Sequence, residues 1–250
     1  KIPSSIKKIE PAAFNSCKSL KKIIFEENSS LSSIEDSAFG ICSSLEEITI
    51  PHSVRSISRF CFNGCIKLKR ITIPSLKLVE ESCFNGCISL EHLIIPFPAS
   101  SIQKNAFFNC TNLNQVYIPQ SVTSINFSSF CLCSSLVELM IPDSVISIEP
   151  YALYKCTSLM KLNIPSSVKE IGKNALNECS KLVDLEFNAS VTKIEDSLFE
   201  ECSSLKEISI PSCVKEIGKF AFQGCSSLEK INFCSPPSLV LIDDYAFCKC

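Results

Sequence analysis

The sequence predicts a solenoid of about eleven stacked coils of ~23 residues, each coil contributing a short strand to a parallel sheet. Three observations predict this fold class. Cysteines recur at a nearly constant spacing, apolar residues keep fixed positions relative to them, and a strand-like pattern is followed by proline in most periods. Since one coil of this length cannot bury its own apolar side, its stability has to come from stacking on its neighbours.

Eleven cysteines define the period, with gaps of 22 to 25 residues between them: Cys17, Cys42, Cys65, Cys87, Cys110, Cys133, Cys156, Cys179, Cys202, Cys225 and Cys250. Phe or Leu lies three residues before each of these cysteines, and a branched aliphatic residue lies eight before. The period spans residues 1–250, so a single domain is predicted. The chain begins Lys1-Ile2-Pro3 without an initiator Met, and we expect it to be a fragment of a longer chain.

Within one period, the pattern Leu45-x-x-Ile48-x-Ile50 predicts a short strand with one buried face, because side chains alternate between the faces of a strand. The following proline lacks the N–H that strand pairing needs and ends the strand. A second apolar pair then returns the chain along the opposite side. The Ala-Phe-x-x-Cys segment fits one helical or 3₁₀ turn, since its Phe and Cys lie three residues apart.

The spacing between cysteines changes at three places. Extra residues occur near 27–29 and near 236–237, and one residue is missing near Ser75 and Leu76. All three fall in the segment that follows the predicted strand. A segment that tolerates length changes should be an outer turn, where the main chain reaches water.

The repeat resembles the BspA-like class of leucine-rich repeat. The phrase C-x-S-L-x-x-I-x-I-P-x-S-V-x-x-I-x-x-x-A-F-x-x stands almost unmodified at residues 202–224, and Leu153 and Leu176 in place of Phe are local departures. The resemblance covers essentially the whole chain. It implies a curved leucine-rich repeat solenoid with its parallel sheet on the concave side. It also implies surface proteins of anaerobic bacteria and mucosal protozoan parasites, which adhere to host proteins or to other cells.

The period explains most of the 17 cysteines as a buried, reduced column, because a free buried Cys behaves as a small hydrophobe. Cys61 and Cys83 occupy the small-residue position before Phe and should be buried too. With Cys65 and Cys87 they leave open a four-thiol zinc site, although structural zinc motifs usually use tighter spacing. Cys213 and Cys234 fall in outer turns and are expected to be the reactive thiols.

No catalytic constellation is recognisable in the sequence. The chain has two His, and it contains no G-x-x-x-x-G-K-[ST], G-x-G-x-x-G, H-E-x-x-H or G-x-S-x-G motif. No enzyme activity, metal or cofactor is expected. A net charge of −2 argues against a nucleic-acid footprint, and no apolar run approaches the ~18–20 residues of a membrane helix.

The predicted sheet presents three outward positions in every coil, and their character changes along the chain. Toward the ends they carry charges of alternating sign, which predicts a self-neutralised face. In the centre they carry contiguous apolar residues, which often mark partner sites. The candidate protein-binding residues are Ile94, Tyr117, Val137, Met140 and Met160, with His92 beside them. The competing interpretation is that curvature or an adjoining segment covers these side chains.

The sequence therefore predicts a non-enzymatic protein-binding or adhesion module with a protein partner. The resemblance implies a host extracellular-matrix or cell-surface protein as that partner, and a cell-surface or secreted location. The alternative is an intracellular repeat scaffold for protein–protein interaction, which a reduced cysteine column favours. Nucleic-acid binding and membrane insertion within this segment are not expected.

Overall fold

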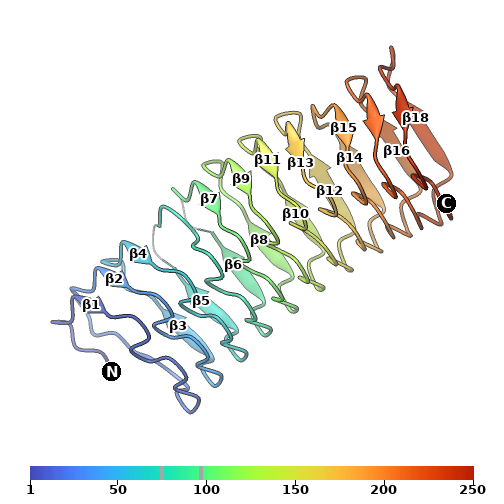
Figure 1. The fold of residues 1–250 in the computed structure, drawn as a ribbon. Helices are drawn as coiled ribbons and strands as arrows, with labels where there is room; N and C mark the ends of the chain where they lie inside the picture. Colours follow the sequence, from blue (N-terminus) through green and yellow to red (C-terminus); the bar gives the residue numbers. More distant parts are fainter. Residues whose placement is uncertain (74–75, 96–97) are drawn as a thin grey trace.

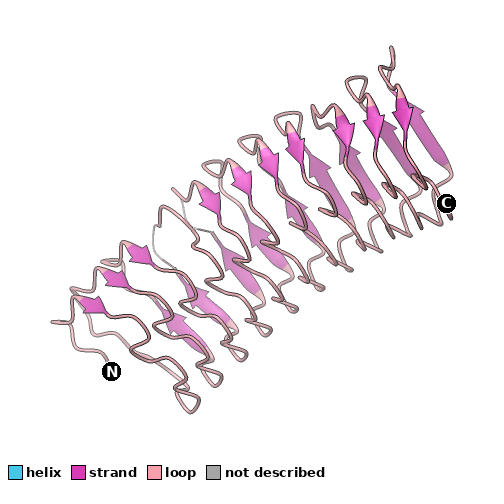
Figure 2. Cartoon of the chain, in the orientation of Figure 1, coloured by secondary structure: helices cyan, strands magenta, loops and turns pink. Residues whose placement is uncertain are grey.

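The computed structural model describes residues 1–73, 76–95 and 98–250, which form one elongated array of stacked coils (Figure 1). The two chain ends lie at opposite ends of the stack. Two rows of strands run along two sides of the array, and most coils contribute one strand to each row (Figure 2). Every strand pairing is parallel and joins residues about one repeat apart, as in Leu139 with Leu162. The predicted solenoid with parallel sheets is confirmed.

The strands of three or four residues form one side of the array, which we call the long-strand sheet. It comprises β3 (Glu47–Thr49), β5 (Arg70–Thr72), β6 (His92–Ile94), β8 (Gln115–Tyr117), β10 (Glu138–Met140), β12 (Lys161–Ile164), β14 (Asp184–Phe187), β16 (Glu207–Ile210) and β18 (Lys230–Phe233). Strand pairing divides this row into three hydrogen-bonded groups: β3 with β5, β6 to β14, and β16 with β18. These strands coincide with the predicted alternating segments. The middle residue of each three-residue strand points inward and its neighbours point outward, as period-two geometry requires.

Two-residue strands form the other side, which we call the short-strand sheet. It comprises β1 (Lys8–Ile9), β2 (Ser33–Ile34), β4 (Ser56–Ile57), β7 (Ser101–Ile102), β9 (Ser124–Ile125), β11 (Ser147–Ile148), β13 (Glu170–Ile171), β15 (Lys193–Ile194), β17 (Glu216–Ile217) and β19 (Leu241–Ile242). Strand pairing divides this row into three hydrogen-bonded groups: β1 to β4, β7 to β13, and β15 to β19. Val79 adds a bridge to Ile102 within the same row. The second residue of each strand up to β17 is the branched aliphatic of the repeat and is buried.

The segment between the short strand and the ladder cysteine was expected to be a helical or 3₁₀ turn, and this expectation is wrong. The described residues contain no helix; the segment is a series of turns. In every coil, two residues of this segment have positive φ. One lies five residues before the ladder cysteine and the other lies directly before it, as Ser37 and Ile41 do for Cys42. A right-handed helix needs negative φ throughout, so these residues interrupt it. The absence of a helix among the described residues also leaves no candidate membrane span there.

The core between the two sheets consists of columns in which each coil contributes the same or a similar apolar residue. Phe107 is fully buried, and its ring centroid lies 5.5 Å from that of Phe84 and 5.2 Å from that of Phe130 in the neighbouring coils. These rings are nearly parallel. The column is interrupted by Leu153 and Leu176, which are also buried. The stack therefore tolerates the two departures from the repeat without losing register.

The ladder cysteines form a second buried column, as predicted for a small hydrophobe. The nine ladder cysteines from Cys42 to Cys225 are completely buried, and Cys61 and Cys83 are buried beside them. Cys17 and Cys250, in the two terminal coils, are not buried, because each has a stacking neighbour on one side of the column. The prediction that every ladder cysteine is shielded is therefore wrong for these two.

Two of the three places where the repeat length changes lie in the described residues, and both are in turns or bends, as predicted. Residues 27–28 form a turn and residues 235–236 a bend, each after the long-strand position of its coil. The missing residue near Ser75 falls outside the described residues.

Candidate protein-binding surface

The outward side of the long-strand sheet carries all the candidate binding residues. Ile94, Tyr117 and Met140 occupy the same outward position in β6, β8 and β10, and their side chains are 74%, 61% and 62% exposed. The inward residues between them, such as Leu93 and Val116, are buried. The predicted assignment of strand faces is therefore confirmed.

Strand register brings these side chains into contact range. Ile94 pairs directly with Tyr117, and the pairing of Leu139 with Val116 places Met140 next to Tyr117. Neighbouring parallel strands lie about 4.8 Å apart, so successive outward side chains touch.

A second outward position continues the apolar surface. Val137, Met160 and Val183 precede β10, β12 and β14, and each is about half exposed. Main-chain hydrogen bonds from Met160 N to Val137 O (2.9 Å) and from Val183 N to Met160 O (3.1 Å) hold the three in line. We call the six residues Ile94, Tyr117, Val137, Met140, Met160 and Val183 the central apolar patch.

No described part of the chain covers this patch, so the competing interpretation of a shielding segment does not hold for residues 1–73, 76–95 and 98–250. His92 is also exposed and pairs with Gln115 at the border of the patch. It lies on the same face as the other candidates, as predicted.

Charged residues outside the patch neutralise one another, as the alternating signs predict. Lys22 Nζ lies 2.7 Å from Glu47 Oε1, and Arg70 approaches the same carboxyl from the next coil at 3.9 Å. The hydrogen bond from Lys22, together with the two positive charges, lowers the pKa of Glu47. All three side chains are exposed, so these pairs contribute little to stability.

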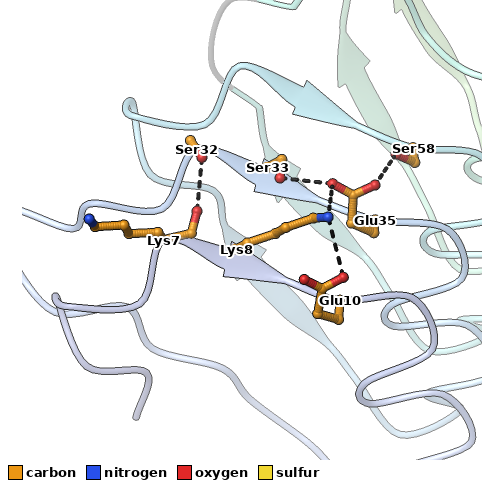
Figure 3. A network of polar contacts seen from close by, with 7 residues as sticks. All are labelled: Lys7, Lys8, Glu10, Ser32, Ser33, Glu35 and Ser58. Atoms are coloured by element: carbon orange, nitrogen blue, oxygen red, sulfur yellow. Dashed lines mark hydrogen bonds and ion pairs between the residues drawn. The ribbon is translucent and has the colours of Figure 1, made fainter.

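The first coils of the short-strand sheet present polar side chains instead, whereas Leu241 and Ile242 of β19 are about half exposed. Figure 3 shows these first coils, where Lys8 lies between Glu10 (3.3 Å) and Glu35 (3.5 Å). The same Glu35 carboxyl accepts hydrogen bonds from Ser33 (2.9 Å) and Ser58 (3.5 Å). In these first coils the polar groups satisfy one another, in contrast to the apolar side chains of the central apolar patch.

An aromatic cluster on the turn segments was missed by the sequence reasoning. The rings of Phe127 and Tyr151 meet edge to face at 5.7 Å, and Tyr151 meets Tyr154 at the same distance. Tyr154 donates to Glu178 Oε1 (3.0 Å), and Lys155 lies 5.2 Å from the Tyr154 ring. The only available signal was aromatic residues at outward turn positions of two successive repeats.

The thiols show no metal-site geometry in the part of the chain that the structure describes. No group of three or more His, Cys, Asp or Glu residues there is arranged to hold a metal ion. Among the off-column cysteines, Cys234 is exposed, whereas Cys213 is partly buried and its thiol donates to the carbonyl of Val191 at 3.3 Å. Cys234 is thus the more accessible of the two thiols expected to react.

These features define a leucine-rich repeat solenoid with an exposed apolar patch on one sheet. Residues 1–96 and 124–250 match the model of the BspA type leucine-rich repeat region, in six copies. The chain belongs to this family. The match indicates no catalytic family, and such solenoids are consistent with protein-interaction modules. A search of curated proteins finds no match.

Solved structures with the same fold include bacterial leucine-rich repeat proteins, one of which is described as a cell surface protein. A leucine-rich repeat protein from Bacteroides ovatus is 28% identical with a TM-score of 0.83, and the alignment covers 100% of this chain and 70% of that one. The pneumococcal vaccine antigen PcpA is 27% identical with a TM-score of 0.66, covering 99% of this chain and 65% of that one. A leucine-rich cell surface protein from Faecalibacterium prausnitzii is 25% identical with a TM-score of 0.51, covering 94% and 78%.

Proposed function

We propose that the chain is a non-enzymatic protein-binding module of a cell-surface protein and that the central apolar patch is its binding site. The observation that carries the proposal is the contiguity of six exposed apolar side chains over five successive coils. Monomeric proteins rarely leave such a surface uncovered unless it meets a partner. Away from the patch the sheet carries charged pairs such as Lys22 with Glu47, which suit water rather than a partner.

The cell-surface part of the proposal is supported by the similar structures. One of them is described as a cell surface protein and another as a vaccine antigen. Host extracellular-matrix or cell-surface proteins are the partner class that fits a surface module of this family.

Binding of the purified chain to immobilised extracellular-matrix proteins and to intact mammalian cells tests the proposal. Tyr117→Ala should weaken binding about thirtyfold, because buried aromatic anchors at the centre of an interface typically contribute ~2 kcal/mol or more. Charge reversal at Lys21 or Glu229, toward the ends of the array, should change affinity much less. Thermal melts must first show that each variant remains folded. Equal losses from central and terminal variants would contradict the assignment of the site.

An intracellular repeat scaffold is the second candidate, and the free cysteines favour it. All 17 thiols are unpaired in the structure, and disulfides are rare in reducing compartments. Labelling of intact source cells with a membrane-impermeant biotin reagent separates the two candidates. The surface module should be labelled without cell lysis, and the intracellular scaffold only after lysis.

A further inference from the structure

The central apolar patch has an oblique shape that constrains what can bind to it. Ile94, Tyr117 and Met140 occupy the last outward position of β6, β8 and β10. The other three residues, Val137, Met160 and Val183, lie directly before β10, β12 and β14, which is three residues earlier in the repeat. Val137 and Met140 belong to the same coil and join the two halves. The patch therefore crosses the sheet diagonally.

Its dimensions follow from strand geometry. Five coils at ~4.8 Å spacing give a length of about 19 Å, and three residues along a strand give a width of about 10 Å. An α-helix has a diameter of ~10–12 Å with side chains, and about 13 of its residues span 19 Å. A single helix of a partner thus matches both dimensions.

The spacing of the coils also favours a helix over an extended peptide. One helical turn rises ~5.4 Å, which is close to the ~4.8 Å spacing of the coils. Over three coils, the side chains of a helix lying along the array are therefore displaced from the coils by only about 2 Å. In an extended peptide, side chains on the same face lie ~6.7 Å apart, so over three coils they are displaced from the coils by about 6 Å. Its main chain would also lack partners, because β8, β10 and β12 are already paired on both edges.

The polar positions around the patch are predominantly acidic. Across the coils of β6 to β14, the outward positions carry one lysine and four carboxylates, a net charge of −3 with His neutral: Lys161, Glu91, Glu138, Asp184 and Glu186. Lys161 Nζ lies 3.3 Å from Asp184 Oδ2. Within the described residues, Glu91, Glu138 and Glu186 have no cationic group within 4.0 Å. A partner with basic residues beside its apolar side chains would complement this surface.

We propose that the central apolar patch binds one amphipathic helix of a partner protein, about 13 residues long, with Lys or Arg bordering its apolar face. This inference rests on the proposed protein-binding function and names the chemistry of the partner. Tyr117 lies near the middle of the first half of the patch and is the principal anchor. Glu138 lies beside the junction of the two halves and pairs with the basic border.

Synthetic peptides of about 14 residues provide the test, because they match the length of the patch. The first peptide consists of Leu and Lys with Leu at i, i+3, i+4 and i+7. The second has the same composition with Leu and Lys alternating, which suits an extended strand. The third replaces Lys by Glu in the helical arrangement. Each carries a fluorophore, and anisotropy measures its affinity for the purified chain at two salt concentrations.

The helical Lys peptide should bind at least tenfold more tightly than either of the other two, with affinity falling as salt rises. Tyr117→Ala should weaken this binding at least tenfold and Glu138→Gln several-fold. Ile24→Ala is the matched control, because Ile24 is half exposed at the equivalent outward position of the sheet but lies outside the patch. Its effect should stay within twofold.

Equal or tighter binding of the alternating peptide, equal binding of the acidic peptide, or no binding of the helical Lys peptide would overturn the inference. An equal effect of Ile24→Ala and Tyr117→Ala would overturn it as well. The cell- and matrix-binding assay tests the proposed protein-binding function independently of the peptides. If Tyr117→Ala still reduces binding to matrix proteins or cells, the patch remains a protein-binding site and only the helical partner is wrong.

Discussion

The thiol of Cys133 donates to the main-chain carbonyl oxygen of Phe107, one coil earlier in the stack, at 3.3 Å. The same oxygen accepts the main-chain N–H of Cys110 at 3.2 Å, so both of its acceptor positions are used. Ten ladder cysteines from Cys42 to Cys250, Cys133 included, make this contact at 3.1 to 3.4 Å. A thiolate or a disulfide sulfur has no proton to donate, so this arrangement requires reduced, protonated cysteine.

Thiol labelling of the native chain should therefore divide the cysteines into two groups. We expect Cys234 and Cys250, which are exposed, to react rapidly with Ellman's reagent, and the rapid phase to include at most the five thiols that are not buried. The twelve buried thiols should react only as the chain unfolds. Cys234→Ser should remove one thiol from the rapid phase, whereas Cys110→Ser should leave it unchanged. A rapid phase of most of the 17 thiols would contradict the buried column.

Alkaline pH should destabilise the fold through the same column. Burial raises the pKa of Cys110 and Cys179 to about 12, whereas an unfolded Cys titrates near ~8.5. Between these values the folded state holds protons that the unfolded state has lost, so stability falls as pH rises. The effect is absent below about pH 8 and amounts to ~1.4 kcal/mol per pH unit for each such thiol above its unfolded pKa.

Urea denaturation followed by circular dichroism between pH 7 and pH 10 checks this prediction. The midpoint should decline above about pH 9, and thiolate absorbance should appear together with unfolding. The double variant Cys110→Ala and Cys179→Ala should show a shallower decline than the parent chain. Thiolate formation in a chain that keeps its full dichroism would show that the column titrates while folded.

The sequence was sufficient to predict the coil, its strand and the columns that face inward or outward, because period-two alternation and stacking determine them. Ile94 and Tyr117 are exposed for this reason, and their placement needed no knowledge of the turns. The turn conformation could not be predicted, since Ile41 is not a residue that favours positive φ. Its conformation is imposed by a neighbouring coil, where the carbonyl of Asn63 accepts the Ile41 N–H at 2.7 Å. The identity of a partner is not encoded in such contacts.

Truncation of the phenylalanine column should be costly in the middle of the stack. Phe107→Ala removes a buried ring that packs on rings in both neighbouring coils, and should destabilise the fold by about 3–5 kcal/mol. Phe107→Leu should cost much less, because Leu153 and Leu176 fill the same position elsewhere. Lys169→Ala, at an exposed site, should change stability by less than ~0.5 kcal/mol. Chemical denaturation measures all three, and similar values for the two Phe107 variants would argue against a packed column.

Relief of backbone strain at Ile41 should stabilise the chain. Ile41 has φ of 56°, a left-handed conformation that costs an L-residue about 1–2 kcal/mol. Gly64, Gly86 and Gly224 occupy the equivalent position in other coils, at φ of 70°, 71° and 74°. Ile41→Gly should therefore raise the free energy of unfolding by about 1 kcal/mol, after the greater freedom of unfolded glycine offsets part of the gain.

Two control variants separate conformation from packing in this experiment. Ile41→Val keeps the branched side chain and the strain, and should change stability little. Gly64→Ala introduces strain without crowding, because the added Cβ would lie 3.6 Å from the Ile41 side chain, an ordinary contact distance. It should cost about 1 kcal/mol in urea denaturation, since the backbone there is incompatible with Ala. If Ile41→Gly instead destabilises the chain more than Ile41→Val, the half-exposed Ile41 side chain contributes more through packing than its backbone loses through strain.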